Sequence, residues 1–472
     1  DNLRCAEVKR FTLYILTLLL IGAAPAQPLP QACTAAHAKL LSLDSLPVGT
    51  PTEYCPWLKG YGLLLHSLAY GQPPNADSIS VLIDEQSAMN LDKQNKALCL
   101  SDLYIIRSLA NISNKAYLQA AISYLSAMCT AGDCNGWMAN RWQMLNCVMC
   151  AQIHNNVPLI YNSSAIGSQI DKFTSIVDKL LTDSTMPKSF TDETKLLSAL
   201  LLPLVGDDGS RSVQMCTSYG KEWATNSPLA AYVTAMTYIK NGHSAQALQI
   251  LTTADSAGFC IKMNKLNLQL GNLLLNQQND SCQIFLNRYI EYQTNGADVP
   301  YAQMKLAWLA FLSGDSASVR QLCACVMSAK PLTPNDEQAR YECGLVAEWN
   351  ITLLRARLLF DNGDYEKCIS VLKSIDSEEL TSIQQSEYFY RLGRAYQKTG
   401  NLTLAATHLQ SAINNKVSTE VYYPSYAAYY LGVVHKKLGH QEQAHRYFSI
   451  CQQTDSPICR ELIHRRAKMA DN

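Results

Sequence analysis

The sequence predicts an all-α fold: an α-solenoid in which antiparallel helical hairpins stack beside one another. Five segments in the second half of the chain share one pattern centred on a glycine. Small and large residues recur at fixed distances from that glycine, whereas the apolar–polar alternation typical of strands is scarce throughout. One hairpin cannot bury its own apolar face, so a repeated hairpin pattern predicts a stack.

The shared glycine is predicted to be the turn between two helices, and it occurs at Gly242, Gly314, Gly363, Gly400 and Gly439. A small residue stands seven positions before each glycine: Ala235, Ala307, Ala356, Gly393 and Gly432. A small or slim residue stands five positions after it: Ala247, Val319, Cys368, Ala405 and Ala444. Glycine ends a helix readily because its left-handed conformation carries no Cβ penalty. The small residues let the two helices approach closely.

The spacing of the turn glycines predicts where further elements lie. Successive glycines are 72, 49, 37 and 39 residues apart. The first gap is wide enough for one more hairpin, which we expect to turn near Gln278-Asn279-Asp280. The repeat array is therefore predicted over residues 228–456, followed by a basic C-terminal helix or tail over residues 457–472.

One copy of the pattern, residues 386–413, resembles the tetratricopeptide repeat. Its matching residues are Phe389, Leu392, Gly393, Tyr396, Gly400, Ala405, Leu409 and Ala412. The copy from Ser425 matches at Ala428, Leu431, Gly432, Gly439, Ala444 and Phe448. It departs from the family at His435, and the copy from Trp349 departs at Arg355. The copies from Pro300 and Pro228 match more weakly, so the resemblance covers about half of the chain.

The first half of the chain, residues 27–227, is predicted to be a degenerate continuation of helical hairpins. Residues 103–128 show the apolar spacing of a hairpin that turns at Ser113-Asn114. Residues 57–70 and 141–153 are predicted as further helices. The polar residues 182–194 and 206–211 are predicted as loops, and the second loop is expected near the boundary between the two halves.

The N-terminal residues 1–26 have the pattern of a secretory signal peptide. Lys9-Arg10 precede an apolar run over residues 11–24, and Ala24-Pro25-Ala26 offers a cleavage site before Gln27. The run is short for a membrane span, although an uncleaved anchor is the alternative. Residues 1–7 are interpreted as untranslated, with Val8 as the start. We therefore expect an exported protein, periplasmic or extracellular, in a bacterium.

Cysteine usage agrees with export. The chain has 17 Cys, and removal of Cys5 with the signal peptide leaves an even number. Disulfides are expected in such a compartment. The close candidate pairs are Cys129–Cys134, Cys147–Cys150, Cys451–Cys459 and Cys33–Cys55. Others, such as Cys323 and Cys368, stand where a small buried residue is wanted and are predicted to be packed thiols.

No sequence pattern indicates catalysis, a cofactor or a metal. Lys+Arg and Asp+Glu both number 39, so no basic excess indicates nucleic-acid binding. The CxxC sequence at Cys147 lies in an apolar helical run rather than at a helix start, which disfavours a redox role. His435, His440 and His445 straddle a turn, which disfavours a metal site. The sequence contains none of the common nucleophile, phosphate-loop or zinc-protease motifs.

The resemblance implies a peptide-binding groove, because the first helix of each tetratricopeptide hairpin lines the concave surface. Carried over position by position, the groove residues are Arg357, Tyr390, Arg391, Arg394, Gln397, Tyr426, Tyr429 and Lys436. Tyrosine and arginine are common anchors of interfaces, and a basic wall suits an acidic peptide or a C-terminal carboxylate. Tyr390 and Arg394 replace residues of the family's carboxylate clamp. The alternative is that these side chains only pack between repeats or face solvent.

Three functions remain open at this stage. The first is an exported interaction scaffold or adaptor that binds a polypeptide on the concave face of the array. The second is a protein whose residues 27–227 carry an enzymatic activity that no motif reveals. The third is an envelope assembly factor anchored by an uncleaved N-terminal helix.

Overall fold

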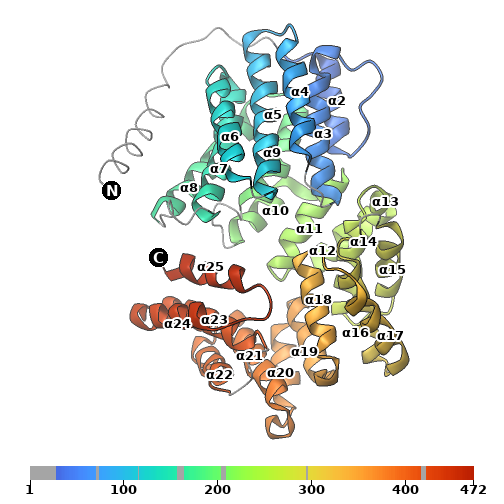
Figure 1. Cartoon of the computed structure of the whole chain (residues 1–472), viewed down its shortest axis with the longest axis vertical. Helices are drawn as coiled ribbons and strands as arrows, with labels where there is room; N and C mark the ends of the chain where they lie inside the picture. Colours follow the sequence, from blue (N-terminus) through green and yellow to red (C-terminus); the bar gives the residue numbers. More distant parts are fainter. Residues whose placement is uncertain are drawn as a thin grey trace. The chain divides into compact units, whose positions relative to one another are not determined.

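The computed structural model describes residues 28–70, 74–114, 116–156, 164–202, 209–293, 296–415 and 421–471. Every regular element within these ranges is helical, so the predicted all-α class is confirmed. The chain divides into two compact units, Asp1–Ala230 and Ala231–Asn472 (Figure 1). The predicted signal peptide and its cleavage site lie outside the described residues.

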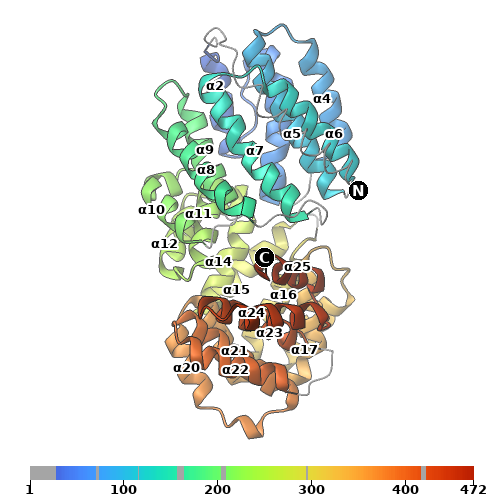
Figure 2. The same cartoon turned by 90° about the vertical axis from the view of Figure 1, so that its left-hand side faces the viewer.

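Unit 1 is built from helices that pack mainly on their neighbours in sequence (Figure 2). They are α2 (Gln31–Leu41), α3 (Cys55–Tyr70), α4 (Ala76–Ala88), α5 (Lys93–Ser113), α6 (Tyr117–Ala131), α7 (Gly136–Asn156), α8 (Ser164–Thr182), α9 (Lys188–Leu201) and α10 (Ser210–Ala224). Helix α11 (Pro228–Lys240) spans the boundary between the units. Helices α5 and α6 form the hairpin that the sequence predicts, and α5 ends with Asn114 as its C-cap.

The two predicted loops of the first half are partly helical. Helix α9 begins at Lys188, so the loop prediction for residues 182–194 is wrong over its second part. Phe190, Thr194 and Leu197 are buried on one face of α9, and Glu193 beside them is fully buried in an ion pair. The sequence of this segment is polar partly because Glu193 is charged, and a charged residue is not expected in a helix core unless it has a buried partner. Helix α10 likewise begins at Ser210, inside the predicted loop 206–211.

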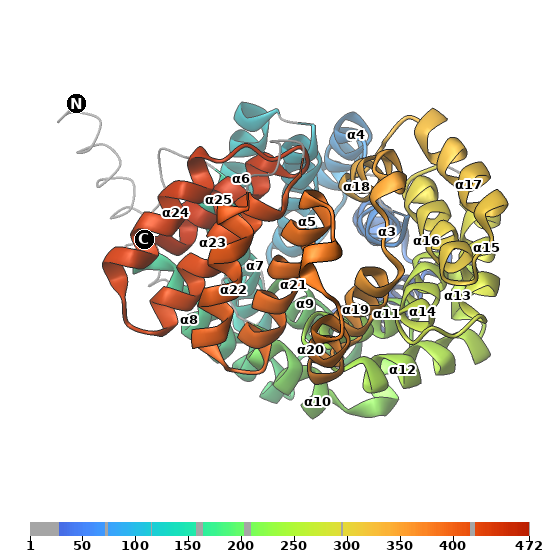
Figure 3. The same cartoon turned by 90° about the horizontal axis from the view of Figure 1, so that it is seen from below.

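Unit 2 continues with helices α12 to α25, which follow one another around a curved row (Figure 3). They are α12 (Ser244–Ser256), α13 (Phe259–Lys262), α14 (Lys265–Asn276), α15 (Cys282–Tyr292), α16 (Val299–Leu312), α17 (Ser316–Ser328), α18 (Pro334–Gly344), α19 (Ile351–Asn362), α20 (Tyr365–Lys373), α21 (Ser382–Lys398), α22 (Leu402–Asn414), α23 (Tyr423–Lys437), α24 (Gln441–Gln453) and α25 (Arg460–Asp471).

The hairpins of unit 2 stack as a solenoid. Within each hairpin the two helices contact each other: α14 with α15, α16 with α17, α19 with α20, α21 with α22 and α23 with α24. The first helices also contact one another in sequence, from α14 through α16, α19 and α21 to α23. Each first helix therefore belongs to one continuous row, which is the row that the sequence predicts to carry the groove.

All five predicted turn glycines have the left-handed backbone that the pattern requires. Their φ angles are +79°, +79°, +89°, +83° and +80° at Gly242, Gly314, Gly363, Gly400 and Gly439. The two glycines that stand seven positions earlier, Gly393 and Gly432, lie where the two helices of their hairpins approach closely. At Gly393, for example, a Cβ atom would lie 2.6 Å from Leu409 Cγ. The turn and the small residues are thus fixed by the same hairpin geometry.

The predicted sixth hairpin is present between α14 and α15. Gln278 takes the left-handed turn position with φ +55°. Gly271 stands seven residues before it, where a Cβ would lie 2.8 Å from Leu286. Helix α18 is an insertion between two hairpins and contacts α16 and α17, which accounts for the long spacing between Gly314 and Gly363.

Two turns of unit 2 touch although they are far apart in sequence. Ser244 Oγ donates a hydrogen bond to the Asn362 carbonyl oxygen over 118 residues of chain, at 2.5 Å. A Cβ atom on Gly363 would lie 2.6 Å from the Gly242 carbonyl oxygen. Both glycines therefore serve a backbone-to-backbone contact as well as their own turns.

Candidate functional site

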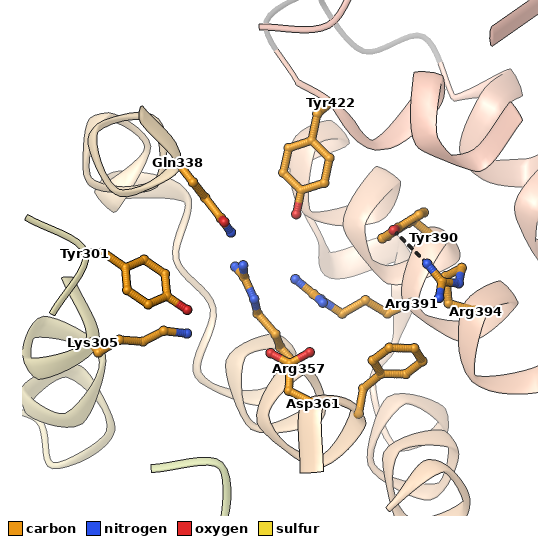
Figure 4. Close-up of a pocket in the computed structure, with 10 residues that line it drawn as sticks. Tyr301, Lys305, Gln338, Arg357, Asp361, Tyr390, Arg391, Arg394 and Tyr422 are labelled. Carbon is orange, nitrogen blue, oxygen red and sulfur yellow. Dashed lines mark hydrogen bonds between the residues drawn. The ribbon is translucent and has the colours of Figure 1, made fainter. Parts of the chain in front are cut away.

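A polar cavity of about 300 Å³ opens on the row of first helices in unit 2 (Figure 4). Its walls come from α16, α18, α19, α21 and the residue that precedes α23. The lining residues are Tyr301, Lys305, Gln338, Arg357, Phe360, Asp361, Tyr390, Arg391, Arg394 and Tyr422. Four of these side chains are cationic and one is a carboxylate, so the cavity is strongly basic.

Two of the cations are paired with carboxylates that lie outside the lining. Arg357 Nη1 donates to Glu342 Oε1 at 2.7 Å, and its guanidinium lies 4.4 Å from the centre of the Trp308 ring. Arg391 Nε donates to Glu387 Oε1 at 2.6 Å, one helical turn away on α21. Both arginines are more than nine-tenths buried. These ion pairs hold the guanidinium groups in place at the cavity wall.

Lys305 is a buried cation without such a pair. Its side chain is 4% exposed, and Nζ lies 3.8 Å from the centre of the Trp308 ring. Within the described residues no carboxylate oxygen lies within 4.0 Å of Nζ. Burial, and then the neighbouring charge of Arg357, lower the pKa of Lys305 to about 7. Lys305 therefore gives up its proton more readily than an ordinary lysine does.

Arg394 also lacks a carboxylate partner among the described residues. Its Nε donates to Gln397 Oε1 at 3.1 Å and its Nη1 to the Tyr390 hydroxyl at 3.3 Å. The guanidinium lies over the Tyr430 ring, 3.3 Å from its centre. All of these partners are neutral. They orient the guanidinium but do not cancel its charge.

The charged ends of the lining residues converge. Three cations point toward the middle of the cavity: Lys305 from α16, Arg357 from α19 and Arg391 from α21 (Figure 4). Two neutral side chains, Tyr422 and Gln338, approach from the other side. Burial raises the pKa of both Tyr301 and Tyr422, so their hydroxyls stay protonated at neutral pH and can donate hydrogen bonds. The arrangement suits an anion that accepts hydrogen bonds from several directions.

Four predicted groove residues line this cavity: Arg357, Tyr390, Arg391 and Arg394. Gln397 lies behind them and accepts a hydrogen bond from Arg394. The remaining three lie elsewhere, against α24 and α25. Tyr426 and Tyr429 pack on the cluster that contains Phe448, Ile463 and Ala467, and Lys436 Nζ donates to the Ala470 carbonyl oxygen at 2.6 Å.

Helix α25 is the physical reason for this separation. Its buried residues Ile463 and Ala467 pack against α23 and α24. It therefore covers the part of α23 that carries Tyr426 and Tyr429, and the basic cavity lies on the preceding helices instead. The sequence prediction missed six lining residues, namely Tyr301, Lys305, Gln338, Phe360, Asp361 and Tyr422. The one signal for them was a lysine inside the apolar run of α16.

Unit 1 contains a different charged cluster, centred on Arg141. Its Nε and Nη2 donate to the two carboxylate oxygens of Glu193, each at 2.7 Å, and Nη1 donates to Asp102 Oδ1 at 2.6 Å. Tyr61 donates to Glu193 at 2.5 Å and Trp57 Nε1 to Asp102 at 3.0 Å. These five side chains are at most 5% exposed.

The pKa directions in this cluster follow from the two competing effects. Burial raises the pKa of Glu193, but the bidentate Arg141 outweighs it and leaves that pKa well below its usual value. At Asp102 burial dominates and raises the pKa. His37 stacks on Phe190 at 4.3 Å, and its Nε2 lies 3.8 Å from Glu193 Oε1. The cluster is closed off by its own aromatic side chains.

Three of the four predicted disulfides are not formed in the structure. Cys129 is exposed at the end of α6, whereas Cys134 is buried after it, and both are free thiols. Cys451 and Cys459 are also free, as are Cys33 and Cys55. Cys451 is fully buried under α25, with its Sγ 3.9 Å from Ser425 Oγ. Cys147 is buried in α7, and the side chain of Cys150 lies outside the description.

The histidines of the last turn do not gather around a common point. His435 and His440 approach with their Nδ1 atoms 3.4 Å apart, whereas His445 Nδ1 lies 2.8 Å from Asp471. In the described part of the chain, no three His, Cys, Asp or Glu side chains are grouped as metal ligands would be. Nor does any helix there combine the length and apolar character needed to cross a bilayer.

No protein-family model matches the chain, and comparison with curated proteins finds no significant match. The helical repeat architecture therefore rests on the structure itself. The tetratricopeptide resemblance, the signal peptide and the export that it implies stay predictions.

Proposed function

We propose that this protein is an interaction scaffold that binds an acidic segment of another polypeptide, with the basic cavity of unit 2 receiving the acidic group. One observation carries the proposal: four cationic side chains and a single carboxylate line one cavity on the row of first helices. Helical solenoids present extended surfaces of this kind to partner chains.

The composition of the cavity supports a polypeptide partner. Tyr301, Tyr390 and Tyr422 line it together with arginines, and these two residue types dominate the energetic centres of protein interfaces. Their aromatic rings provide rigid apolar area, while their hydroxyls and the guanidinium groups provide donors for an acidic side chain or a C-terminal carboxylate.

Energetics also favour an anionic partner. A buried ammonium without a carboxylate, as at Lys305, costs stability in the free protein. An anion in the cavity would offset part of that cost, because it restores a favourable partner for the charge. Ligands that bind only the folded state raise its stability, so the acidic partner is expected to stabilise unit 2.

Export belongs to the same proposal. The signal-like residues 9–26 support a scaffold that works in the periplasm or outside the cell, and the resemblance to tetratricopeptide repeats supports peptide binding by the first helices. The enzymatic alternative for residues 27–227 has less support, because the charged cluster around Arg141 is enclosed and its hydrogen bonds run among its own members.

Binding of labelled decapeptides to the full chain, measured by fluorescence anisotropy, tests the proposal. A glutamate-rich decapeptide should bind, and a lysine-rich decapeptide of equal length should not. Arg394→Glu should weaken binding of the acidic peptide by about tenfold or more, because the substitution reverses a charge at the cavity wall. The matched control is Arg320→Glu on the exposed face of α17, which should leave binding unchanged. Equal binding of both peptides, or an unaffected Arg394→Glu variant, would overturn it.

A further inference from the structure

We propose that the acidic group received by the basic cavity is a phosphoryl group carried by a polypeptide side chain. This inference rests on the proposed function and deepens it, because it names the ligand chemistry. It rests on the two cations of the lining that form no ion pair, on the donors that face the cavity and on the directions from which these donors come.

Two cations at the cavity have no ion-pair partner of their own. Glu342 and Glu387 compensate Arg357 and Arg391, whereas Lys305 and Arg394 have no carboxylate within ion-pair distance in the described chain. Two cations of the lining are thus outside any ion pair, and Asp361, the one carboxylate of the lining, offsets one of their charges. A phosphorylated side chain carries about −1.5 to −2 charges at neutral pH, whereas a carboxylate carries one.

The number of donors points the same way. A carboxylate offers about four lone-pair sites in one plane, whereas a phosphoryl group offers three strongly accepting oxygens arranged around phosphorus. Arg357 and Arg391 each use part of a five-donor guanidinium on their glutamates, so further N–H groups remain for a ligand. The Lys305 ammonium has three donors and lies over the rings of Tyr301 and Trp308.

The directions of approach suit a tetrahedral rather than a planar acceptor. Three different helices bring Lys305, Arg357 and Arg391 into the cavity, and Tyr422 reaches the same cavity from above them in the view (Figure 4). A planar carboxylate can meet donors well only near its own plane. An oxyanion with three terminal oxygens can meet all of these groups together, and arginine forks are well matched to phosphate.

The size of the cavity limits what it can enclose. Its volume of about 300 Å³ is at the lower end of ligand pockets, which range from roughly 300 to 1,000 Å³. This is room for the phosphorylated end of a side chain rather than for a folded partner.

Isothermal titration calorimetry of the full chain with three peptide pools tests the inference. The pools are degenerate nonapeptides that differ only at the central residue, which is serine, glutamate or phosphoserine. The phosphoserine pool should bind about tenfold or more tightly than the glutamate pool. Inorganic phosphate and acetate are titrated separately, so that recognition of the free anion is distinguished from recognition of the peptide.

The variants Lys305→Met and Lys305→Arg make the test specific. Lys305→Met should remove the preference for phosphoserine, and Lys305→Arg should retain most of it, because the charge and donors are kept. The control Arg320→Glu should behave as the unmodified chain does. A melting temperature at or above that of the unmodified chain shows that Lys305→Met is folded.

The outcomes separate the two proposals. Equal affinity for the glutamate and phosphoserine pools overturns the phosphoryl inference and leaves the acidic scaffold intact. If neither pool binds, both proposals fall. If inorganic phosphate binds as tightly as the phosphoserine pool, the polypeptide source is overturned. A preference for phosphoserine that survives in Lys305→Met removes the assignment to this cavity.

Discussion

Each unit buries arginine side chains, but the two units pair those charges to different extents. In unit 1 the single guanidinium of Arg141 meets two carboxylates, with three hydrogen bonds of 2.6–2.7 Å. In unit 2 the cations lining one cavity outnumber the carboxylates, and Lys305 and Arg394 have neutral or aromatic neighbours. The first cluster is closed and the second opens onto a cavity.

The difference favours a structural role for the first cluster and agrees with the binding role proposed for the second. A fully paired, enclosed cluster fixes how α3, α5, α7 and α9 of unit 1 fit together, because its members hydrogen-bond across those helices. An incompletely paired cluster at a cavity costs stability in the free protein and recovers it when an anion arrives. Loss of a charge should therefore have opposite effects in the two units.

The largest expected effect is that of Arg141→Met. This change leaves Asp102 and Glu193 buried without their partner, and it should lower the free energy of unfolding by about 3–5 kcal/mol. Urea denaturation followed by tryptophan fluorescence measures it. The control is Arg211→Met, which removes an exposed pair with Asp171 and should cost about 0–1 kcal/mol. Similar losses in the two variants would contradict the structural role of the cluster.

Lys305→Met should have the opposite sign. The substitution replaces a buried ammonium with an apolar side chain of similar length, so the free energy of unfolding should rise by about 1–4 kcal/mol. Anion binding should be lost in the same variant. As a control, Lys367→Met removes a mostly exposed lysine on α20 and should change neither property. Destabilisation by Lys305→Met would show that the ammonium is satisfied within the fold.

The smallest effect concerns pH. Lys305 has an ordinary pKa of 10.5 and a pKa of about 7 in the folded chain. Between these values the unfolded chain binds the extra proton, so this residue makes stability rise with pH from about 7 upward. Glu193 affects stability in the acid range instead. Its pKa in the folded chain is lower than its ordinary pKa of 4.5, so the stability that it contributes is lost as the pH falls below 4.5.

Urea denaturation at pH 7, 8 and 9 checks this prediction when the unmodified chain is compared with Lys305→Met. The difference in unfolding free energy between the two proteins should shrink as the pH rises, because other titrating groups are common to both. A difference that stays constant across the range would show that Lys305 keeps its ordinary pKa in the folded state.

The repeat architecture could be predicted from the sequence because its determinants are local. Gly400 and Ala405 belong to one hairpin, and the distance between them is set by the turn. The same holds for Gly271 and Gln278, which identify a hairpin even though its turn residue is not glycine. Such patterns need no knowledge of the neighbouring repeats.

The cavity could be predicted only in part, because its other walls come from distant segments. Arg357, Tyr390, Arg391 and Arg394 follow from repeat positions. Gln338 lies on the inserted helix α18, and Tyr422 caps α23, so their places depend on how the insertion and the curvature bring those helices together. A basic C-terminal helix or tail is predicted over residues 457–472, but its packing over Tyr426 and Tyr429 is not, because only two fully buried apolar residues, Ile463 and Ala467, mark that contact.

The contact between the turns at Gly242 and Gly363 changes how unit 2 should unfold. In a linear array each repeat depends only on its immediate neighbours, and unfolding can begin at either end and proceed stepwise. Here Ser244 is bonded to Asn362 across 118 residues, so the intervening hairpins form a closed loop of chain. Opening that loop releases all of them together, and closing it must bring two remote turns into register. Unit 2 is therefore expected to unfold with the cooperativity of a globular domain and to fold more slowly than an open array of the same length.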